Sequence, residues 1–216
     1  AAGGNTLTVT NVETLVGGSG DDTVTFTGSN AGTLTLGGGA DHITISGATG
    51  VQTIVYSATS DYGDDITGFT AGSGGDVIKV NVAMSRGTNA DFEALATGGT
   101  VGANTAVVNY TTNITNYGAA ADVATAMNTL TGLAAGNQML FAVGNGTHSR
   151  LWHWQDGTGG GSSDGTVEAE ELAAVVDLSS VSHTTLTAAN FSGYTGTDPL
   201  VFDLDGDGVE LLGTDA

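Results

Sequence analysis

The sequence predicts a mainly β fold, in which a short parallel β-roll, or β-solenoid, is followed by a β-rich module with a few short helices. Short runs such as Thr23–Thr27 alternate between apolar and Thr residues, which is the period of a strand with one buried face. Gly-rich turns separate these runs, and Gly accounts for 36 of the 216 residues. Because strands this short cannot bury a face alone, they are expected to stack in repeating coils.

The roll is expected over residues 1–85, where short strands and turns follow each other closely. The strands are expected at residues 7–10, 23–26, 33–36 and 43–45, and the Gly-rich turns at 17–20, 37–39 and 72–75. In this arrangement the apolar residues Val24, Ile43 and Ile78 point into the core and stack between coils.

Residues 86–192 are predicted to form a β-rich α+β module. Asn89–Ala96 is expected to be a short helix that begins with a capping Asn, and Thr105–Thr112 is expected to be a strand. The segment 119–130 places apolar residues at i, i+4 and i+7, which predicts a further helix.

The rest of this module combines a hairpin with short helical segments. Gln138–Val143 and Ser149–Gln155 are predicted strands, joined by a turn at Gly144–Gly146. A helix is expected from about Val167 to Val176, and a short apolar helix or turn is expected near Leu186–Phe191.

The charge of the chain excludes several classes of partner. It has 23 acidic and only 3 basic residues, for a formal net charge of −20. Nucleic acids and anionic membranes are bound by basic residues, so neither is an expected partner. The apolar stretches are too short to span a bilayer, which predicts no membrane insertion. The chain has no Cys and hence no disulfide or thiolate site, whereas its acidity suits cations.

The strongest motif is Gly17–Thr25, which matches the nonapeptide G-G-x-G-x-D-x-U-x at every defined position, U being a large apolar residue. The glycines allow positive φ angles and inward carbonyls, and the Asp at position six adds a carboxylate. All-oxygen ligation of this kind suits a hard cation such as Ca²⁺. Leu36–Thr44 and Ala71–Lys79 keep four of the defining residues, and Tyr62–Phe69 is a looser relative. The alternative for each turn is an Asp that hydrogen-bonds its own backbone.

Residues 17–79 resemble the RTX (repeats-in-toxin) proteins, whose repeats form a parallel β-roll that binds Ca²⁺ between successive turns. The resemblance implies type I secretion, folding on extracellular Ca²⁺ and a secreted or cell-surface location. In that family the sixth-position Asp and the preceding turn carbonyls ligate calcium. The acidic residues close to these positions are further candidate calcium ligands. The candidate ligands of this region are Gly18, Gly20, Asp21, Asp22, Gly37, Gly39, Asp41, Asp61, Asp64, Asp65, Gly72, Gly74 and Asp76.

A second candidate calcium site lies in the loop 156–171. The second half of an EF-hand loop is matched by Asp164, by the Gly and the apolar residue that follow it, and by Glu171. The first half of such a loop is not matched. Asp156 is placed to fold back and supply the missing carboxylate. The alternative is an ordinary helix start whose acids favour the N-terminal dipole, and both interpretations stay open. The segment 61–191 is also similar in texture to the region after RTX-type repeats in surface-layer and adhesin-like bacterial proteins.

A third motif carries Asp203, Asp205 and Asp207 at the acid spacing of a calcium loop, although position twelve is Thr rather than Glu. Just upstream, the run that begins with Asp198 and Pro199 resembles the start of the self-processing module of some RTX proteins. That resemblance implies calcium-dependent cleavage of the Asp198–Pro199 bond. Residues 193–216 are accordingly expected to be a linker and the start of a further calcium-binding module, and the linker interpretation is preferred to cleavage.

The expected function is that of a non-enzymatic, calcium-binding structural segment of a large extracellular bacterial protein. The sequence has none of the common hydrolase or nucleotide-binding motifs, and its four His residues lack the spacing of a metal site. Two alternatives stay open: a part of a self-cleaving protein, and an ice- or carbohydrate-binding solenoid suggested by the Thr-x-Thr runs. Calcium ions are the expected partners, and self-association or a cell-surface glycan are left open.

Overall fold

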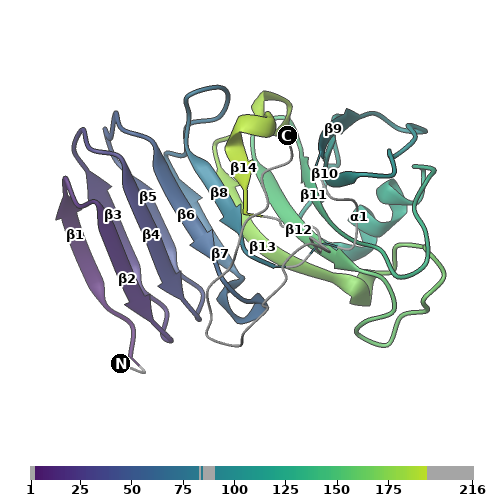
Figure 1. Ribbon diagram of the computed structural model, residues 1–216, viewed down its shortest axis with the longest axis horizontal. Helices are drawn as coiled ribbons and strands as arrows, with labels where there is room; N and C mark the ends of the chain where they lie inside the picture. The colour runs from purple at the N-terminus through teal and green to yellow at the C-terminus, as the bar shows by residue number, and fades with distance from the viewer. Residues whose placement is uncertain (1–2, 83, 85–90, 194–216) are drawn as a thin grey trace, which may run out of the picture.

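The fold of residues 3–82, 84 and 91–193 is described by a computed structural model (Figure 1). The first eight strands are β1 Thr6–Thr10, β2 Thr14–Gly18, β3 Thr23–Thr27, β4 Gly32–Gly37, β5 His42–Ile45, β6 Gln52–Tyr56, β7 Asp64–Thr67 and β8 Val77–Val80. The later strands are β9 Asp91–Leu95, β10 Thr105–Tyr110, β11 Gln138–Gly144, β12 Ser149–Gln155, β13 Leu172–Ser179 and β14 Phe191–Ser192. The helical segments are α1 Ala120–Met127 and the 3₁₀ turns η1 Thr59–Asp61, η2 Ala169–Glu171, η3 His183–Thr185 and η4 Ala188–Asn190.

The strands β1 to β8 alternate between two sheets, which is the connectivity of a parallel β-roll. One sheet has nine strands in the order β1-β3-β5-β7-β13-β12-β11-β10-β9, and the other has five in the order β14-β8-β6-β4-β2. Every pairing among β1 to β8 is parallel. The predicted mainly β fold with a short parallel roll is therefore confirmed.

Apolar residues at matching positions of successive coils stack into columns inside the roll. In the nine-stranded sheet Leu7, Val24, Ile43 and Ile66 are register partners, and in the five-stranded sheet Leu15, Leu34, Ile54 and Ile78 are register partners. The predicted inward positions are correct, but they belong to two columns: Val24 stacks on Ile43, and Ile78 stacks on Ile54.

Glycine is needed in the turns because neighbouring coils approach there through their backbones. Gly37 has φ of +90°, and a Cβ at this residue would lie 2.1 Å from the carbonyl oxygen of Gly18 in the adjacent coil. A side chain would be strained by the backbone angle and would also push the two coils apart.

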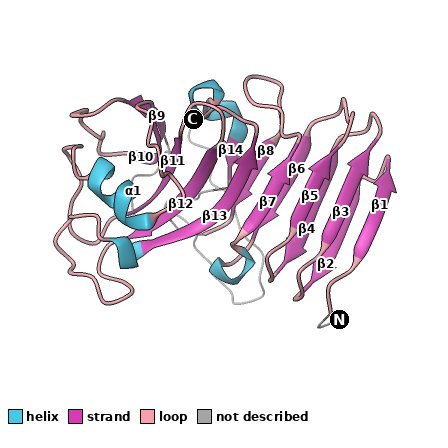
Figure 2. Ribbon diagram, turned by 180° about the vertical axis from the view of Figure 1, so that it is seen from behind, coloured by secondary structure: helices cyan, strands magenta, loops and turns pink. Residues whose placement is uncertain are grey.

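The nine-stranded sheet continues from the roll into the second half of the chain without a break. Strand β13 pairs in parallel with β7 and antiparallel with β12, so it joins the two halves of the sheet. The boundary expected near residue 85 therefore does not interrupt the sheet. A second apolar cluster includes Phe141 and Trp154, which stack at 5.8 Å, and the buried residues Val123 and Met127 of α1. Figure 2 shows α1 toward the end of the molecule opposite β1.

Several predicted elements of the second half are confirmed. The predicted hairpin forms with β11 and β12 in antiparallel register from Gln138–Gln155 to Gly144–Ser149. The predicted strand at 105–112 corresponds to β10, and the helix predicted within 119–130 corresponds to α1. The expected short helix or turn near Leu186 is the 3₁₀ turn η4.

Two predicted helices are wrong. The segment predicted as the helix Asn89–Ala96 contains strand β9, which pairs in parallel with β10. The helix predicted at 167–176 is limited to the 3₁₀ turn η2, and the chain then continues as strand β13. In both segments pairing with neighbouring strands outweighs local helix propensity, and the adjacent β-branched residues Val175 and Val176 favour the strand.

Candidate functional site

Three buried aspartates stack along one edge of the roll, where the chain passes from the five-stranded to the nine-stranded sheet. Asp22 immediately precedes β3, Asp41 immediately precedes β5, and Asp64 is the first residue of β7. Their exposed fractions are only 4%, 2% and 3%. We call these three residues the aspartate ladder. A column of buried carboxylates is costly unless hydrogen bonds or counter-charges compensate it.

Each carboxylate of the aspartate ladder accepts a hydrogen bond from the backbone of the preceding coil. The amide of Asp22 donates to Oδ1 of Asp41 at 2.7 Å, and the amide of Asp41 donates to Oδ1 of Asp64 at 2.9 Å. The amide of Asn5 donates to Oδ1 of Asp22 at 2.7 Å, which extends the pattern to the first coil. These bonds link neighbouring coils, unlike the alternative interpretation in which each Asp bonds its own turn.

The hydrogen bonds leave part of the aspartate ladder uncompensated. Oδ2 of Asp41 is buried without a hydrogen-bond partner, and the hydroxyl of Tyr56 faces the carboxylate of Asp64. The pKa of Asp64 is raised to about 7, and burial is the largest cause. The hydrogen bond from the backbone of Asp41 lowers this pKa, whereas the negative charge of Asp41 raises it. Burial also raises the pKa of Asp41, to which the charge of Asp22 adds. The site therefore favours a bound proton or a cation.

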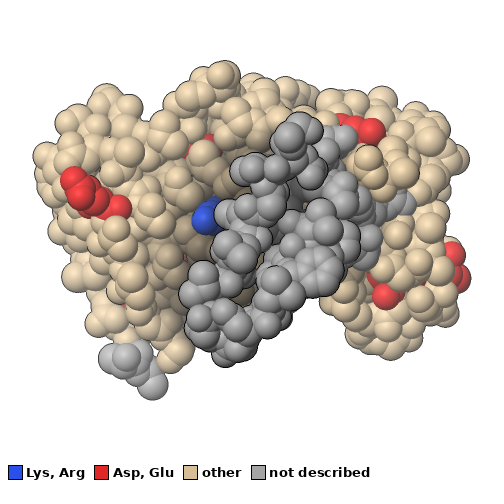
Figure 3. Space-filling model, viewed as in Figure 1, with Lys and Arg blue, Asp and Glu red and all other residues tan. Residues whose placement is uncertain are grey.

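No basic side chain within the described ranges forms a salt bridge with the aspartate ladder. Among those residues the ion pairs are His42 with Asp65, at 3.0 Å, and Arg150 with Asp177. Figure 3 shows acidic groups toward both ends of one face and a small basic area between them. The unpaired oxygen of Asp41 and the lack of a basic partner among the described residues suit the binding of a hard cation, because hard cations prefer oxygen ligands.

The carboxylates alone do not form a complete metal site. Within residues 3–82, 84 and 91–193, no group of three or more His, Asp or Glu side chains is arranged to hold a metal ion. A cation at the aspartate ladder would therefore depend on one or two carboxylates together with backbone carbonyls and water, which calcium accepts readily.

Asp76 was grouped by sequence with Asp22 and Asp41, but it lies at the opposite edge of the roll. It precedes β8 of the five-stranded sheet, so its register equivalent is the segment before β6. Its Oδ1 accepts the amide of Gln52 and its Oδ2 accepts the amide of Thr70, both at 2.8 Å. Gly72, in the same turn, donates its amide to Asn190. The turn is closed by these bonds, and Asp64 rather than Asp76 is the third member of the aspartate ladder.

The other acidic candidates of the roll have separate partners. Asp21 is exposed and accepts the amide of Ala40 at 2.9 Å. Asp61 accepts the amides of Ser57 and Ala58 and so closes its own turn. Asp65 pairs with His42 and accepts a hydrogen bond from Ser179. The turn glycines Gly18, Gly20, Gly37 and Gly39 lie beside the aspartate ladder, whereas Gly74 lies in the turn of Asp76.

The loop 156–171 is held together by its own carboxylates. Asp156 does fold back: it accepts the amides of Gly136 at 2.6 Å and Gly165 at 3.0 Å. Glu171 accepts the amide of Gly157 at 2.6 Å and the indole Nε1–H of Trp154 at 2.9 Å.

Hydrogen bonding also accounts for the charge of this loop. Burial alone would raise the pKa of Asp156, but the bonds from Gly136 and Gly165 lower it overall. Asp164 accepts the amide of Thr166 and so turns to its own backbone. None of the unpaired buried oxygens of the described residues belongs to this loop, so its geometry does not call for a metal.

Outward-facing threonines form a regular row across the roll. Thr8, Thr25, Thr44 and Thr67 are register partners on β1, β3, β5 and β7. The neighbouring row continues from Thr6 and Thr23 into His42 and Asp65, which breaks the threonine pattern. One row of threonines is regular and the other is interrupted, so the alternative of an ice-binding surface remains untested.

Sequence reasoning did not single out Asn5 or Tyr56. Asn5 lies 17 residues before Asp22, close to the 19 residues that separate Asp22 from Asp41, so the repeat length could have found it. Tyr56 gave no signal, since its place beside the aspartate ladder depends on packing between the two sheets. Asp198, Pro199, Asp203, Asp205 and Asp207 lie outside the described residues, so the predictions made on them remain predictions.

Comparison of the chain with models of protein families, with curated proteins and with solved structures found no match. In the described part of the chain, no helix has the length and apolar character needed to cross a membrane.

Proposed function

We propose that this chain is a calcium-binding structural segment of a larger secreted or surface-attached bacterial protein, exported by a type I system. The observation that carries the proposal is the aspartate ladder: three stacked, buried carboxylates with an unpaired oxygen at Asp41 and no salt bridge to a basic group. Secretion and cell-surface attachment rest on the resemblance to RTX repeats.

Calcium is the cation that best suits this environment. The donors of the edge are carboxylates and turn carbonyls, and calcium accepts six to eight such oxygens in irregular geometry. The residues that would hold it are Asp22, Asp41 and Asp64 with carbonyls of the adjacent Gly turns. A bound dication would neutralise the repulsion along the aspartate ladder, so its binding free energy would appear as folding free energy.

The open end of the roll supports the structural part of the proposal. Leu7 occupies the same inward column as Val24, Ile43 and Ile66, yet it is 43% exposed, whereas the other three are at most 1% exposed. Another coil stacked on this end would cover Leu7, as the preceding coil covers each other member of the column. The edges of β1 and β2 present unpaired backbone groups to such a coil. A non-enzymatic stacking segment suits this end.

Thermal unfolding of EDTA-stripped protein, followed by circular dichroism, tests the proposal. Calcium should raise the melting temperature of the wild type well above that in EDTA, and magnesium should raise it less because it demands a smaller, regular site. Asp41→Asn should lose most of the calcium-dependent rise. Asp21→Asn, in the same stretch but exposed, is the matched control and should keep the rise. Equal melting temperatures in calcium and EDTA would contradict the proposal.

A further inference from the structure

A polar row crosses the outer face of the nine-stranded sheet at the junction of its two halves. His42, Asp65, Asp177 and Arg150 are successive register partners on β5, β7, β13 and β12. Arg150 donates from Nε to Oδ1 of Asp177 at 2.7 Å, and its Nη2 donates to Oδ2 of the same carboxylate. This bidentate pair fixes both side chains in one orientation.

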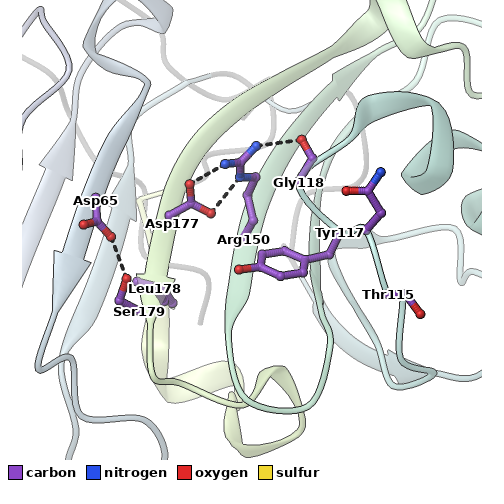
Figure 4. A pocket seen from close by; sticks show the side chains of 9 residues that line it. Asp65, Thr115, Tyr117, Gly118, Arg150, Asp177, Leu178 and Ser179 are labelled. Atoms are coloured by element: carbon purple, nitrogen blue, oxygen red, sulfur yellow. Dashed lines mark hydrogen bonds and ion pairs between the residues drawn. The ribbon is translucent and has the colours of Figure 1, made fainter.

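A cavity of about 360 Å³ lies over this row. Asp65, Asp177 and Arg150 line it from the strands, and the loop residues Thr115, Asn116 and Tyr117 line it from the other side (Figure 4). Figure 4 shows the Tyr117 ring lying across the cavity, with its hydroxyl directed toward β13.

The loop that walls the cavity is tied to the sheet by two hydrogen bonds. Arg150 donates from Nη1 to the carbonyl of Gly118 at 2.9 Å, and the indole of Trp152 donates to the carbonyl of Tyr117 at 3.1 Å. The Arg150 guanidinium also lies over the Trp152 ring, 5.2 Å from its centroid. The cavity is therefore formed in advance of any ligand, and its exposed rim residues Thr115 and Asn116 leave it accessible from solvent.

The charges of the cavity exclude most classes of ligand. Two carboxylates against one guanidinium make it net negative, which disfavours phosphates and carboxylates. The guanidinium is already occupied by Asp177 and Gly118. Both carboxylates also have partners, since Asp65 is paired with His42 and bonded to Ser179, so they do not offer a free cluster to a metal.

The groups left available both donate and accept hydrogen bonds without carrying charge. They are the hydroxyl of Tyr117 and the amide of Asn116, whose Nδ2 is fixed by a 2.7 Å bond to Asp122. Burial raises the pKa of Tyr117, and the charge of Asp177 adds to this, so the phenol stays neutral. A neutral polyhydroxylated ligand matches this set, and a tyrosine ring offers its apolar face to the C–H groups of a sugar.

We propose that this pocket binds a neutral sugar residue, presented at the end or along the side of a glycan. Asn116 and Tyr117 supply the hydrogen bonds, and the Arg150–Asp177 pair forms the rigid floor. The site is independent of the calcium proposal, because none of its residues belongs to the aspartate ladder. The volume lies in the range of small-ligand pockets, while its polar lining suits a sugar better than an apolar compound.

Titration with methyl glycosides of glucose, galactose, mannose and N-acetylglucosamine tests the proposal, with calcium present throughout. Binding is followed by calorimetry and by intrinsic fluorescence, since Trp152 contacts the cavity wall. At least one glycoside should bind at millimolar concentration and change the fluorescence. Asn116→Ala and Tyr117→Phe should each weaken binding by about tenfold, as expected for one or two lost hydrogen bonds.

The control is Thr125→Ala, an exposed change on α1 that does not line the cavity; it should bind like the wild type. Because Asn116 is exposed, its variant should fold normally, which circular dichroism checks. No binding by any of the four glycosides would overturn the proposal. Unchanged affinity in both Asn116→Ala and Tyr117→Phe would also overturn it, as would tighter binding of glucuronic acid than of the neutral sugars.

Discussion

Replacing Asp64 by Asn should change the pH dependence of stability in the metal-free protein. The folded-state pKa of Asp64 is about 7, against an ordinary value of 3.8. Between these two pH values the folded state holds a proton on Asp64 that the unfolded state has lost. Stability contributed by this proton is present at low pH and is lost as pH rises through the window, since the unfolded state then binds fewer protons.

The size of the effect follows from the two pKa values. A difference of about 3 units corresponds to about 4 kcal/mol at 1.36 kcal/mol per unit. Asn carries no charge at any pH, and its Oδ1 can still accept the amide of Asp41. Asp64→Asn should therefore have nearly the wild-type stability at about pH 4 and gain about 4 kcal/mol over the wild type by about pH 8. For a chain of this length that gain is roughly 8–16 °C in melting temperature.

The comparison with the variant is needed because another group titrates with the opposite sign. Burial lowers the pKa of His153 to about 4, so the folded state keeps this ring neutral while the unfolded state becomes protonated. Its contribution is lost as pH falls from about 6.5 to about 4, in the same window where Asp64 is stabilising. Both proteins contain His153, so the difference between them removes its contribution and reports Asp64 together with its coupling to Asp41.

Urea unfolding in EDTA across this pH range, followed by circular dichroism, measures the difference. The reasoning predicts two curves that converge at acidic pH and separate as pH rises. A difference between variant and wild type that stays constant with pH would refute it, because a hydrogen bond or packing change alone does not titrate here.

Three further substitutions test the packing of the roll and the closure of the loop 156–171. Gly37→Ala should lower the free energy of unfolding by about 2–4 kcal/mol, because the residue has φ of +90° and its Cβ would meet Gly18. Gly47→Ala, with φ of +64° but open space around it, should lower it by only about 1 kcal/mol. Equal losses of the two variants in urea unfolding would argue against close stacking of the coils. Ile43→Ala should lower the free energy of unfolding by about 2–5 kcal/mol, whereas Leu7→Ala in the same column should lower it by less than about 1 kcal/mol, since Leu7 lies at the open end. A large loss of stability in Leu7→Ala would mean that this end of the roll is covered. Glu171→Gln should lower the free energy of unfolding by about 1–3 kcal/mol and shift the Trp154 fluorescence, because the carboxylate accepts hydrogen bonds from the indole and from the amide of Gly157. The exposed Glu170→Gln is the control, and similar behaviour of the two variants would contradict the assigned contacts.

The roll was predictable because its determinants are local and repeated. Alternation between Thr and apolar residues fixes which side chains point inward, and the Gly turns fix the length of each coil. For this reason the inward positions of Val24, Ile43 and Ile78 were identified from the sequence. The edge at which each turn lies was not predictable from the motif alone, because similar Gly–Asp turns occur at both edges. Asp76 therefore shares the motif of Asp22 and Asp41 but lies at the other edge of the roll.

The rest of the site depends on contacts between segments that are distant in sequence. Asp64 follows a longer turn that contains η1, so its spacing from Asp41 hides its equivalence to Asp22. Strand β13 has a local pattern compatible with a helix, and only its position between β7 and β12 makes it a strand. The proposed sugar pocket combines β7, β12 and β13 with the loop before α1, an arrangement that no single stretch of sequence records.

Equilibrium dialysis against calcium, with metal measured by atomic emission, tests the central claim most directly. The claim is that the stacked carboxylates of the roll require a cation when they are ionised. At about pH 8, where Asp64 is ionised, we predict that wild-type protein retains calcium and that Asp41→Asn retains measurably less. Equal retention by the two proteins, or no retention by the wild type at millimolar calcium, would contradict the claim.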